Sequence, residues 1–311
     1  MIHKIALKDQ NLHSSFSKGY KPILTIRSGD TLHLTTPDIQ WGYSAQKGEP
    51  KTVFASREKE PEKVHPMIGP IAVEGAKAGM VLEIRTNQVV PGWYGTNWAG
   101  KLPSWQNEKL GLLESERVQL DWMLDADKMS GSCTIGDTEF RVGLSPFLGL
   151  IGLAPEEAGP HSTRPPRRTG GNIDCKELVR GSSLFLPIEV DGALLSIGDG
   201  HALQGDGESS GTAIECPMDL ADVTVILHED WHLSMPRAHT PAGWVTFGFH
   251  EDLNEAAAVA LEDMVQLIQH SYGISKTEAA ALSSVAADLH ITQVVNGVKG
   301  VHAILPHGAL R

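Results

Sequence analysis

Residues 183–208 read SLFLPIEVDGALLSIGDGHALQGDGE, and this stretch decides the fold. Two apolar, strand-like runs flank Asp191-Gly192, and a two-residue Asp-Gly loop between such runs predicts a β-hairpin. In the register that this loop gives, Asp199 lies opposite Leu184. The residues after the second run would then be held at the end of a rigid pair of strands, where a precise site is best built.

The second run ends in the densest polar cluster of the chain, residues 198–208. Its four glycines permit positive φ, so its acidic and histidine side chains can turn toward one point. These side chains belong to Asp199, His201, Asp206 and Glu208. Carboxylates and an imidazole at short spacing suit a divalent cation such as zinc. A twelve-residue calcium loop does not fit, because its fifth and twelfth positions would be leucine and serine. A solvated turn without chemistry is the other interpretation.

Three motifs in and after this cluster resemble the signature of the acetamidase/formamidase family. They are Gly198-Asp199-Gly200-His201, Gln204-Gly205-Asp206-Gly207-Glu208 and Gly211-Thr212-Ala213-Ile214-Glu215. Further matches are spread over nearly the full length: His65-Pro66, Gly69-Pro70, Val73-Glu74-Gly75-Ala76, Gly170-Gly171-Asn172-Ile173-Asp174, Asp252-Leu253 and His302-Ala303-Ile304-Leu305-Pro306. The resemblance implies an amidohydrolase that converts short linear amides, of the formamide or acetamide type, to the acid and ammonia. The chain departs from the family at Met80 and at Ser209-Ser210.

Length and composition indicate one compact enzyme domain, residues 1–311, with a subdivision near 155–170 as the alternative. No apolar run is long enough to span a bilayer and the N-terminus does not resemble a secretion signal, so we expect a cytoplasmic protein. The three cysteines lack CxxC spacing and are odd in number, which favours reduced thiols. A formal charge of −12 without a basic stripe argues against nucleic acid as a partner.

Short alternating runs predict a β-rich α+β fold with a sheet-like or sandwich-like core. We expect strands at 22–26, 30–34, 222–228 and 244–249. Residues 65–84 predict two further strands joined by a Gly-Ala-Lys-Ala-Gly turn.

The C-terminal part predicts a two-helix layer. An apolar stripe at helical spacing begins at Leu253 and ends near Gly273. Ser275 and Glu278 have the spacing of a capping box for a second helix through Leu289, and residues 291–305 return to a strand pattern. Such stripes are core far more often than cofactor contacts.

A long loop rich in proline, glycine and arginine, residues 155–174, precedes the predicted hairpin. A long loop inside a compact chain is usually functional, so we interpret it as part of the site rather than as a linker. Asp174 lies just ahead of the hairpin, where the fold could bring it near Asp199. Asn172 could donate an amide hydrogen bond to a developing oxyanion, and the arginines could balance local acidity.

Aromatic residues gather in 91–105 of a chain that is only 6% aromatic. Such a cluster either packs in the core or walls a pocket. Walls of this kind would exclude water and limit acyl size, so Trp93 and Trp98, with Gln204, are the substrate-binding candidates. Residues 47–64 are charged and without periodicity, which predicts an exposed loop that could act as a flap.

For the amidohydrolase activity that the resemblance implies, these residues favour hydrolysis by water activated on a divalent metal ion, zinc by preference. Asp199 and His201 are the first candidates for its ligands, and Asp174 is the next. His65, held extended by the following proline, and Asp38, an aspartate usual in the family, are further candidates. The structural alternative for His65 is a surface histidine, and the structural alternative for Asp38 is a turn former.

Glu208 and Glu215 are the candidates for the general base that takes the water proton and returns it to the departing nitrogen. Spacing does not choose between them. Asn172 is the third catalytic candidate.

Two other hypotheses remain open. Residues 207–211 match G-x-S-x-G, although no buried strand leads into them and no helix pattern follows. A metal-free amidase would use Ser209 or Cys216 as its nucleophile. A non-catalytic protein that binds a metal or a small acid is the third hypothesis. In each case we expect a small-molecule partner and a homo-oligomer, with no membrane partner.

Overall fold

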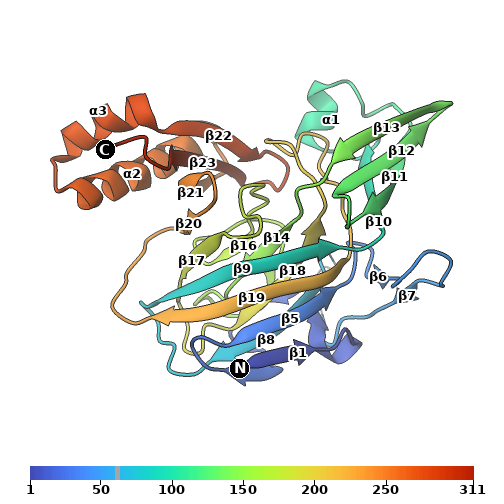
Figure 1. Cartoon of the computed structure of the whole chain (residues 1–311), viewed down its shortest axis with the longest axis horizontal. Coiled ribbons are helices and arrows are strands. Elements are labelled where there is room, and N and C mark those ends of the chain that lie inside the picture. The colour runs from blue at the N-terminus through green and yellow to red at the C-terminus, as the bar shows by residue number, and fades with distance from the viewer. Residues whose placement is uncertain (60–63) are drawn as a thin grey trace.

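The computed structural model describes residues 1–59 and 64–311, and within them two large β-sheets face each other (Figure 1). One sheet has nine strands and the other has six. Two helices lie beyond one end of the nine-stranded sheet, after most of the strands in chain order. The predicted β-rich α+β class, with a sandwich-like core and a C-terminal helical layer, is confirmed.

The nine-stranded sheet contains the first and the last strands of the chain. In spatial order its strands are β1 (Ile2–Ile5), β5 (Thr31–Thr36), β19 (Met218–His228), β9 (Val81–Pro91), β17 (Ser183–Pro187), β20 (Arg237–His239), β21 (Gly243–His250), β23 (Lys299–Pro306) and β22 (Asp288–Gln293). All neighbours are antiparallel except β1 and β5.

The six-stranded sheet holds the centre of the chain. Its order is β16 (Gly170–Asn172), β14 (Phe147–Gly152), β18 (Leu195–His201), β8 (Met67–Val73) and β2 (Leu12–His13), with β4 (Leu24–Ile26) paired parallel to β8. Residues 147–152 and 195–201 are buried throughout. Strands that read as continuous apolar runs are typical of sheets covered on both faces.

One apolar cluster fills the space between the two sheets. It contains Ile84 and Val225 from the nine-stranded sheet and Ile71 and Ile197 from the six-stranded sheet, all fully buried. Full burial of one such side chain is worth about 1.5–3 kcal/mol. The three cysteines are also buried and unpaired, so this core is built without disulfides.

The predicted hairpin around Asp191-Gly192 is wrong. β17 pairs with β9 and β20, whereas β18 pairs with β14 and β8, so the two runs enter different sheets. Leu184 therefore faces Ile84 and Ala238 rather than Asp199. The reason lies in the turn, where three successive residues after Asp191 have positive φ and lead the chain from one sheet to the other.

The same correction applies to residues 65–84. β8 belongs to the six-stranded sheet and β9 to the nine-stranded sheet, so the turn at 75–79 also connects the two layers. A connection between sheets and a hairpin present the same pattern of apolar run, turn and apolar run.

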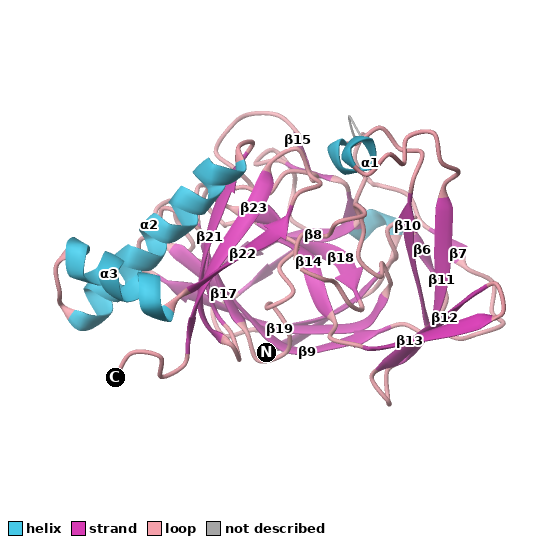
Figure 2. Cartoon of the chain, turned by 90° about the horizontal axis from the view of Figure 1, so that it is seen from above, coloured by secondary structure: helices cyan, strands magenta, loops and turns pink. Residues whose placement is uncertain are grey.

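A four-stranded antiparallel sheet extends from the body of the molecule. It consists of β10 (Tyr94–Ala99), β11 (Val118–Asp125), β12 (Ser130–Ile135) and β13 (Thr138–Gly143), and the short helix α1 (Trp105–Lys109) lies between its first two strands in sequence. Figure 2 places this sheet and the C-terminal helices at opposite ends of the molecule. Two small ribbons complete the strands: β3 (Ser15–Phe16) with β15 (His161–Ser162), and β6 (Gly42–Tyr43) with β7 (Thr52–Val53). A 3-10 turn, η1, spans Asp9–Asn11.

The predicted helical layer is present as α2 (Leu253–Tyr272) and α3 (Lys276–Ala286). The stop at Gly273, in the left-handed conformation, and the capping box of Ser275 and Glu278 are confirmed. The second helix ends at Ala286 rather than at Leu289, because residues from 288 onward pair as β22. α2 packs against β21 and β23 through an apolar stripe.

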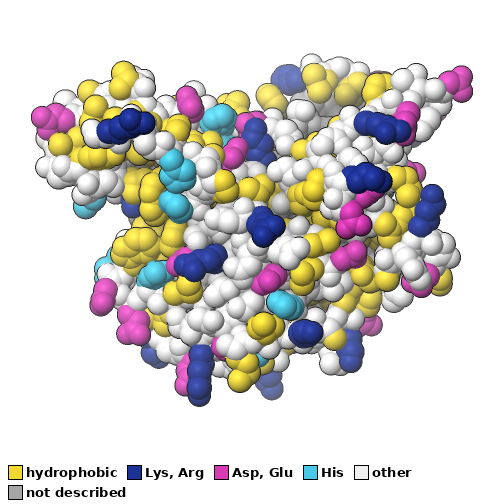
Figure 3. All heavy atoms as spheres, in the orientation of Figure 1, with side chains coloured by type: hydrophobic (Ala, Val, Ile, Leu, Met, Phe, Trp, Pro, Cys, Tyr) yellow, Lys and Arg dark blue, Asp and Glu magenta, His cyan; other side chains and the backbone are white. Residues whose placement is uncertain are grey.

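Part of the predicted loop 47–64 lies outside the described residues. Within the described part, β7 interrupts it and pairs with β6, and residues 60–63 are not described. Among the described helices, none combines the length and apolarity needed to cross a membrane. On the face shown in Figure 3, acidic and basic side chains are interspersed, without a continuous basic stripe.

Candidate functional site

β18 carries the centre of the site on its last three residues. Successive side chains of a strand point to opposite faces, so Asp199 and His201 share one face. His201 Nε2 lies 3.4 Å from Asp199 Oδ2 and 3.2 Å from Glu215 Oε2. Glu215 is held beside them because isolated bridges join it to His201 and to Thr96. All three side chains are buried.

Two further carboxylates complete what we call the acidic cluster: Asp174, Asp199, His201, Glu208 and Glu215. One ligand atom each from Asp174, His201 and Glu208 lie within 4.8 Å of one another, and the same holds for Asp199, His201 and Glu215. His201 is common to both groups. The structure thus brings together five of the residues that the sequence nominated.

The floor of the cluster is the backbone of β14 at Gly149. A Cβ atom at this position would lie 2.7 Å from Asp174 Oδ1, 2.7 Å from His201 Cε1 and 2.9 Å from Asp199 Oδ2. Real Cβ contacts are not this short, so the absence of a side chain makes room for the three groups. Sequence reasoning missed Gly149, which appears there only as one glycine in an apolar run.

Gln204 orients the cluster from within the protein. Its amide nitrogen donates to the carbonyl oxygen of Asp174 at 2.7 Å, so its Oε1, 3.0 Å from His201 Nδ1, accepts from that ring nitrogen. His201 therefore carries a proton on Nδ1 and directs Nε2 toward the carboxylates. Gln204 was expected to contact the substrate, but both ends of its amide are used to hold His201 and Asp174.

Asp174 and Asn172 reach the cluster from the glycine-rich end of the long loop. β16 pairs with β14, and Asp174 N donates to Gly149 O at 3.1 Å. Asn296, in the turn between β22 and β23, donates to Asp174 Oδ2 at 2.8 Å. Sequence reasoning also missed Asn296, because Asn296-Gly297 has the composition of an ordinary turn.

Several buried oxygens of this site have no hydrogen-bond partner among the described residues. They are Asn172 Oδ1, Asp174 Oδ1, Asp199 Oδ1 and Glu208 Oε2. A buried carboxylate oxygen without a partner is costly and rare in proteins. Asp174, Asp199 and Glu208 also stand on backbone with positive φ, a conformation that non-glycine residues adopt at a cost. Both features are typical of a site arranged for a ligand.

Electrostatics of the cluster lead to the same conclusion. Burial, together with the charges of Asp199 and Glu215, raises the pKa of Asp174 to about 8. Burial also raises the pKa of Glu208 well above its usual range, with Asp174 adding to the effect. Burial would raise the pKa of Asp199 too, but the charges of His201 and His65 lower it to about 2. The four carboxylates cannot all be ionised without added positive charge.

The positive charge present is that of His201. Burial opposes protonation of its ring, but Glu215 and Asp199 raise the pKa of His201 well above its usual value. One imidazolium does not balance four carboxylates, whereas a divalent cation held by these residues would offset the remaining negative charge. Oxygen donors with one imidazole suit a hard or borderline divalent ion, so the residues present fit such a group.

A cavity of about 640 Å³ opens onto the cluster. Asp199, Glu208 and Glu215 line it, with Asn172 and Trp98. The structure therefore places the cluster where a small molecule can reach it. A cavity of this size is within the range of small-molecule sites.

His65 and Asp38, the two further ligand candidates, occupy different surroundings. His65 lines the cavity, and its Nδ1 lies 2.8 Å from Thr163 Oγ1. Asp38 accepts hydrogen bonds from Gln40 N and Gly42 N through Oδ1 and from Lys51 Nζ and Tyr94 Oη through Oδ2. Its carboxylate thus organises a turn, as the structural alternative for it expected.

Asp206 and Trp93 do not join the cluster, although Asp206 was expected to turn toward the same point as Glu208. The carboxylate of Asp206 instead contacts Lys176 and His290. Trp93 Nε1 donates to Ser44 O at 3.1 Å, and Trp93 is not among the described residues that line the cavity. Trp98 does line it, with the Arg117 guanidinium 4.9 Å above its ring.

The arginines of the long loop divide in the same way. Arg164 lines the cavity, whereas Arg167 donates to Pro165 O and Arg168 pairs with Glu189 at 2.8 Å. Of these three, only Arg164 is placed to balance charge at the site.

The serine and cysteine nucleophiles of the metal-free hypothesis are poorly placed. Ser209 is exposed, and Ser210 Oγ donates to Thr212 O at 3.4 Å. Cys216 is fully buried, and burial raises the pKa of its thiol well above the usual value, which disfavours the reactive thiolate. Neither group has the activation that nucleophilic catalysis requires.

Comparison with known proteins identifies relatives of the segment that carries the cluster. The sequence model of the Acetamidase/Formamidase family matches residues 156–231. An acetamidase from Mycolicibacterium smegmatis is 59% identical over 46 residues, which are 15% of this chain and 11% of that protein. The chain thus matches a small part of this relative's length. All five residues of the acidic cluster lie within 156–231.

Solved structures extend the likeness to the whole fold. The structure of a predicted acetamidase/formamidase from Thermoanaerobacter tengcongensis has a TM-score of 0.83 and 28% identity, over 98% of this chain and 96% of that chain. An acetamidase from Bacillus halodurans has a TM-score of 0.82 and 27% identity, over 98% of this chain and 97% of that chain.

Proposed function

We propose that this chain, whose resemblance to the acetamidase/formamidase family the comparisons bear out, hydrolyses short linear amides to the carboxylic acid and ammonia with the aid of a divalent metal ion. The observation that carries the proposal is the set of buried carboxylate oxygens around His201 that have no hydrogen-bond partner in the described part of the chain, two of whose residues, Asp199 and Glu208, line the cavity. This arrangement supports metal-assisted hydrolysis better than a serine or cysteine mechanism.

Asp199, His201 and Asp174 would hold the ion, for which zinc is our preference. A divalent ion in such a site lowers the pKa of a bound water and polarises the amide carbonyl. Gln204 fixes the ring of His201 and the backbone of Asp174, so these ligands are oriented before anything binds. Preorganisation of this kind avoids reorganisation during the reaction.

Glu208 is our choice for the general base. Its Oε2 is buried, unpartnered among the described residues and at the cavity wall. Glu215 has less freedom, because its Oε1 accepts from Ala213 N at 3.0 Å and its Oε2 contacts His201. Glu208 would take a proton from water as the new carbon–oxygen bond forms. It would return that proton to nitrogen as the carbon–nitrogen bond breaks, because ammonia leaves well only when the nitrogen is protonated.

Asn172 and Trp98 would act on the substrate. Asn172 lines the cavity beside the cluster, and its amide group can donate to the oxygen that gains charge in the tetrahedral intermediate. Trp98 gives the cavity an aromatic wall that limits the space for the acyl group. We place the enzyme in the cytoplasm, since its three buried thiols are unpaired, and expect a homo-oligomer.

The test compares ammonia release from formamide and acetamide by the wild type and by the His201→Ala and Glu208→Gln variants. We expect His201→Ala to lose both activity and the metal ion bound at the acidic cluster. Glu208→Gln should retain the metal and lose about 10²–10⁴-fold in kcat, because it removes proton transfer. The exposed His270→Ala variant is the matched control. Full activity and unchanged metal content in His201→Ala would overturn the proposal.

A further inference from the structure

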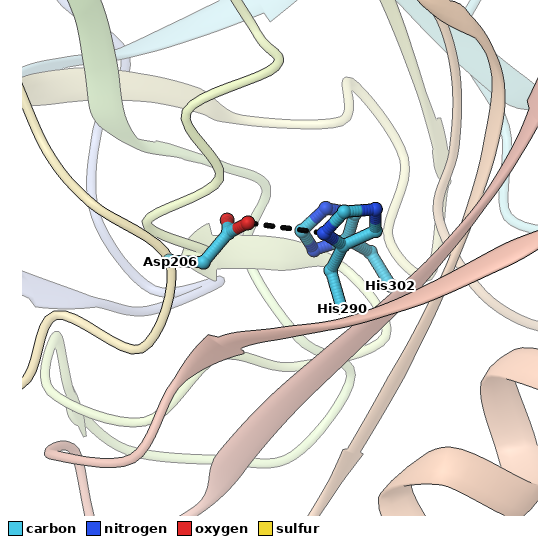
Figure 4. Close-up of side chains that lie close together, drawn as sticks. All are labelled: Asp206, His290 and His302. Atoms are coloured by element: carbon cyan, nitrogen blue, oxygen red, sulfur yellow. Dashed lines mark hydrogen bonds and ion pairs between the residues drawn. The ribbon is translucent and has the colours of Figure 1, made fainter.

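A second group of metal-ligand side chains lies outside the acidic cluster. One ligand atom each from Asp206, His290 and His302 lie within 4.8 Å of one another. Figure 4 shows the two imidazole rings stacked, with the carboxylate of Asp206 facing their edge. The ring centroids are 5.0 Å apart with an interplanar angle of 7°. The proposed amidase chemistry does not use any of these three residues.

The histidines come from neighbouring strands, and the aspartate comes from a distant loop. His290 on β22 is the cross-strand partner of His302 on β23. Asp206 lies in the turn before Glu208. This turn contacts the hairpin of β22 and β23 through hydrogen bonds from Gly207 N to Thr292 O and from Val294 N to Gly207 O, both 3.1 Å. An ion held by all three residues would therefore join the C-terminal hairpin to the segment that carries Glu208.

His302 supplies the observation that points to a ligand. Its side chain is fully buried, and its Nε2 has no hydrogen-bond partner in the part of the chain that the structure describes. The other ring nitrogen, Nδ1, lies 2.8 Å from Thr292 Oγ1. If Nδ1 donates to this hydroxyl, Nε2 presents a bare lone pair, which is how ligating histidines are usually held by an outer partner. A buried ring nitrogen without a partner is otherwise unfavourable.

We propose that Asp206, His290 and His302 form a second site, for a divalent transition-metal ion of the zinc class, which fastens the C-terminal hairpin to the loop before Glu208. Two imidazoles and one carboxylate favour zinc over magnesium or calcium, which prefer oxygen ligands. Zinc ligands lie about 2.0–2.2 Å from the ion, so a small side-chain adjustment suffices to gather these atoms.

Access and proton balance are compatible with an ion at this site. The side chains of Asp206 and His290 are 27% and 33% exposed, so an ion can enter from solvent and reach His302 behind them. His290 Nδ1 now donates to Asp206 Oδ2 at 3.0 Å. When an ion binds between them, the proton of His290 moves to Nε2, and the ring stays neutral.

Lys176 competes for the same carboxylate. Its Nζ lies 2.8 Å from Asp206 Oδ2, and its side chain is 34% exposed, so it can swing away from the site. Lys176 is two residues after Asp174, and Asp206 is two residues before Glu208. Asp174 and Glu208 face the acidic cluster, whereas Lys176 and Asp206 face the second site. Because an ammonium repels a metal cation, removal of this charge should tighten metal binding.

The test is a calorimetric titration of the chelator-stripped full chain with Zn²⁺, with metal content measured by mass spectrometry. We expect each wild-type chain to bind one more equivalent of Zn²⁺ than the His290→Gln variant. Thr292→Val should bind about 10–100-fold more weakly at this site, because it removes the partner of His302 Nδ1. Lys176→Gln should bind about tenfold more tightly, and such a gain cannot come from misfolding. His270→Gln, an exposed histidine on α2, is the matched control.

The difference of one equivalent is independent of the proposed amidase function, because the acidic cluster is intact in both proteins compared. The Asp199→Asn variant serves as a second comparison. It alters the acidic cluster and should still bind one equivalent of Zn²⁺ at the second site. Equal stoichiometry and affinity in wild type and His290→Gln would overturn the inference.

Discussion

At the scale of single residues, the site depends on Gly149, the position where the cluster meets the backbone beneath it. A methyl group there would approach three side-chain atoms of the cluster to 2.9 Å or less. Asp174, Asp199 and His201 would have to move, and catalytic geometry tolerates displacements of well under 1 Å.

We therefore expect Gly149→Ala to lower kcat/KM for acetamide by at least about 100-fold, with reduced metal content and a retained fold. Gly143→Ala is the control, because a Cβ there has nothing within 4 Å. Activity and metal content can be measured together with circular dichroism. Wild-type activity in Gly149→Ala would show that the cluster is not the reaction centre.

His13 is a buried residue whose ionisation links stability to pH. Its Nδ1 donates to Ser15 O at 2.8 Å and its Nε2 accepts from Ser196 Oγ at 3.0 Å, so the neutral ring is satisfied on both sides. Burial lowers its pKa to about 3, with the charge of Arg57 in the same direction. Between about pH 6.5 and pH 3 the unfolded chain therefore binds a proton that the folded chain does not, so His13 removes stability as pH falls.

For His13→Asn we expect a lower unfolding free energy at pH 7 and a weaker dependence of that free energy on pH. The loss of unfolding free energy between pH 7 and pH 4.5 should be smaller than in wild type by about 2–3 kcal/mol. Urea unfolding at the two pH values measures it. His270→Asn, at an exposed position, should keep the wild-type dependence, and an unchanged loss in His13→Asn would contradict this account.

At the scale of elements, the C-terminal layer is fixed by local signals. α3 begins at a capping box in which Ser275 Oγ accepts from Glu278 N and the Glu278 carboxylate accepts from Ser275 N. The preceding α2 is capped by Asp252, whose side chain accepts from Asn254 N and Glu255 N. Caps of this kind satisfy amide groups that the helix itself leaves free.

Ser275→Ala should lower the unfolding free energy by about 0.5–2 kcal/mol, as loss of an N-cap does elsewhere. Ser271→Ala, at an exposed position near the end of α2, should change it much less. Urea denaturation of both variants gives the comparison. Equal stability of Ser275→Ala and wild type would mean that the cap contributes nothing to the layer.

Local signals fix the ends of the helices, but they do not fix how the core strands pair. The two apolar runs within 183–208 have a strand pattern, and both contain strands, β17 and β18. The predicted pairing of these two runs was wrong, because pattern alone does not say which neighbour a strand will pair with. The positive φ values after Asp191 are a property of the folded connection, and a non-glycine residue such as Leu194 gives no sign of them in sequence.

At the scale of the whole molecule, the two sheets and the long loop bring four carboxylates into one buried place. β18 supplies Asp199, the loop before β17 supplies Asp174, and the segment after β18 supplies Glu208 and Glu215. Their mutual repulsion is a cost to the fold that a bound cation would offset.

Removal of divalent ions from the whole enzyme should therefore abolish ammonia release and lower the unfolding temperature, and zinc should restore both. The measurement is activity and thermal unfolding after treatment with a chelator, with zinc-saturated chelator as the control. A serine or cysteine amidase would keep its activity after this treatment.

The sequence by itself determined the β-rich class and the helical layer with its stop and cap signals, and it nominated the residues of the cluster among its candidates. These follow from short-range rules, in which periodicity, capping and glycine-rich motifs depend on near neighbours. Only the tertiary structure decided that β17 and β18 enter different sheets, that Gln204 holds His201, and that Asp206 turns away toward His290. Those outcomes depend on contacts between distant segments, such as Asn296 with Asp174, which no local pattern encodes.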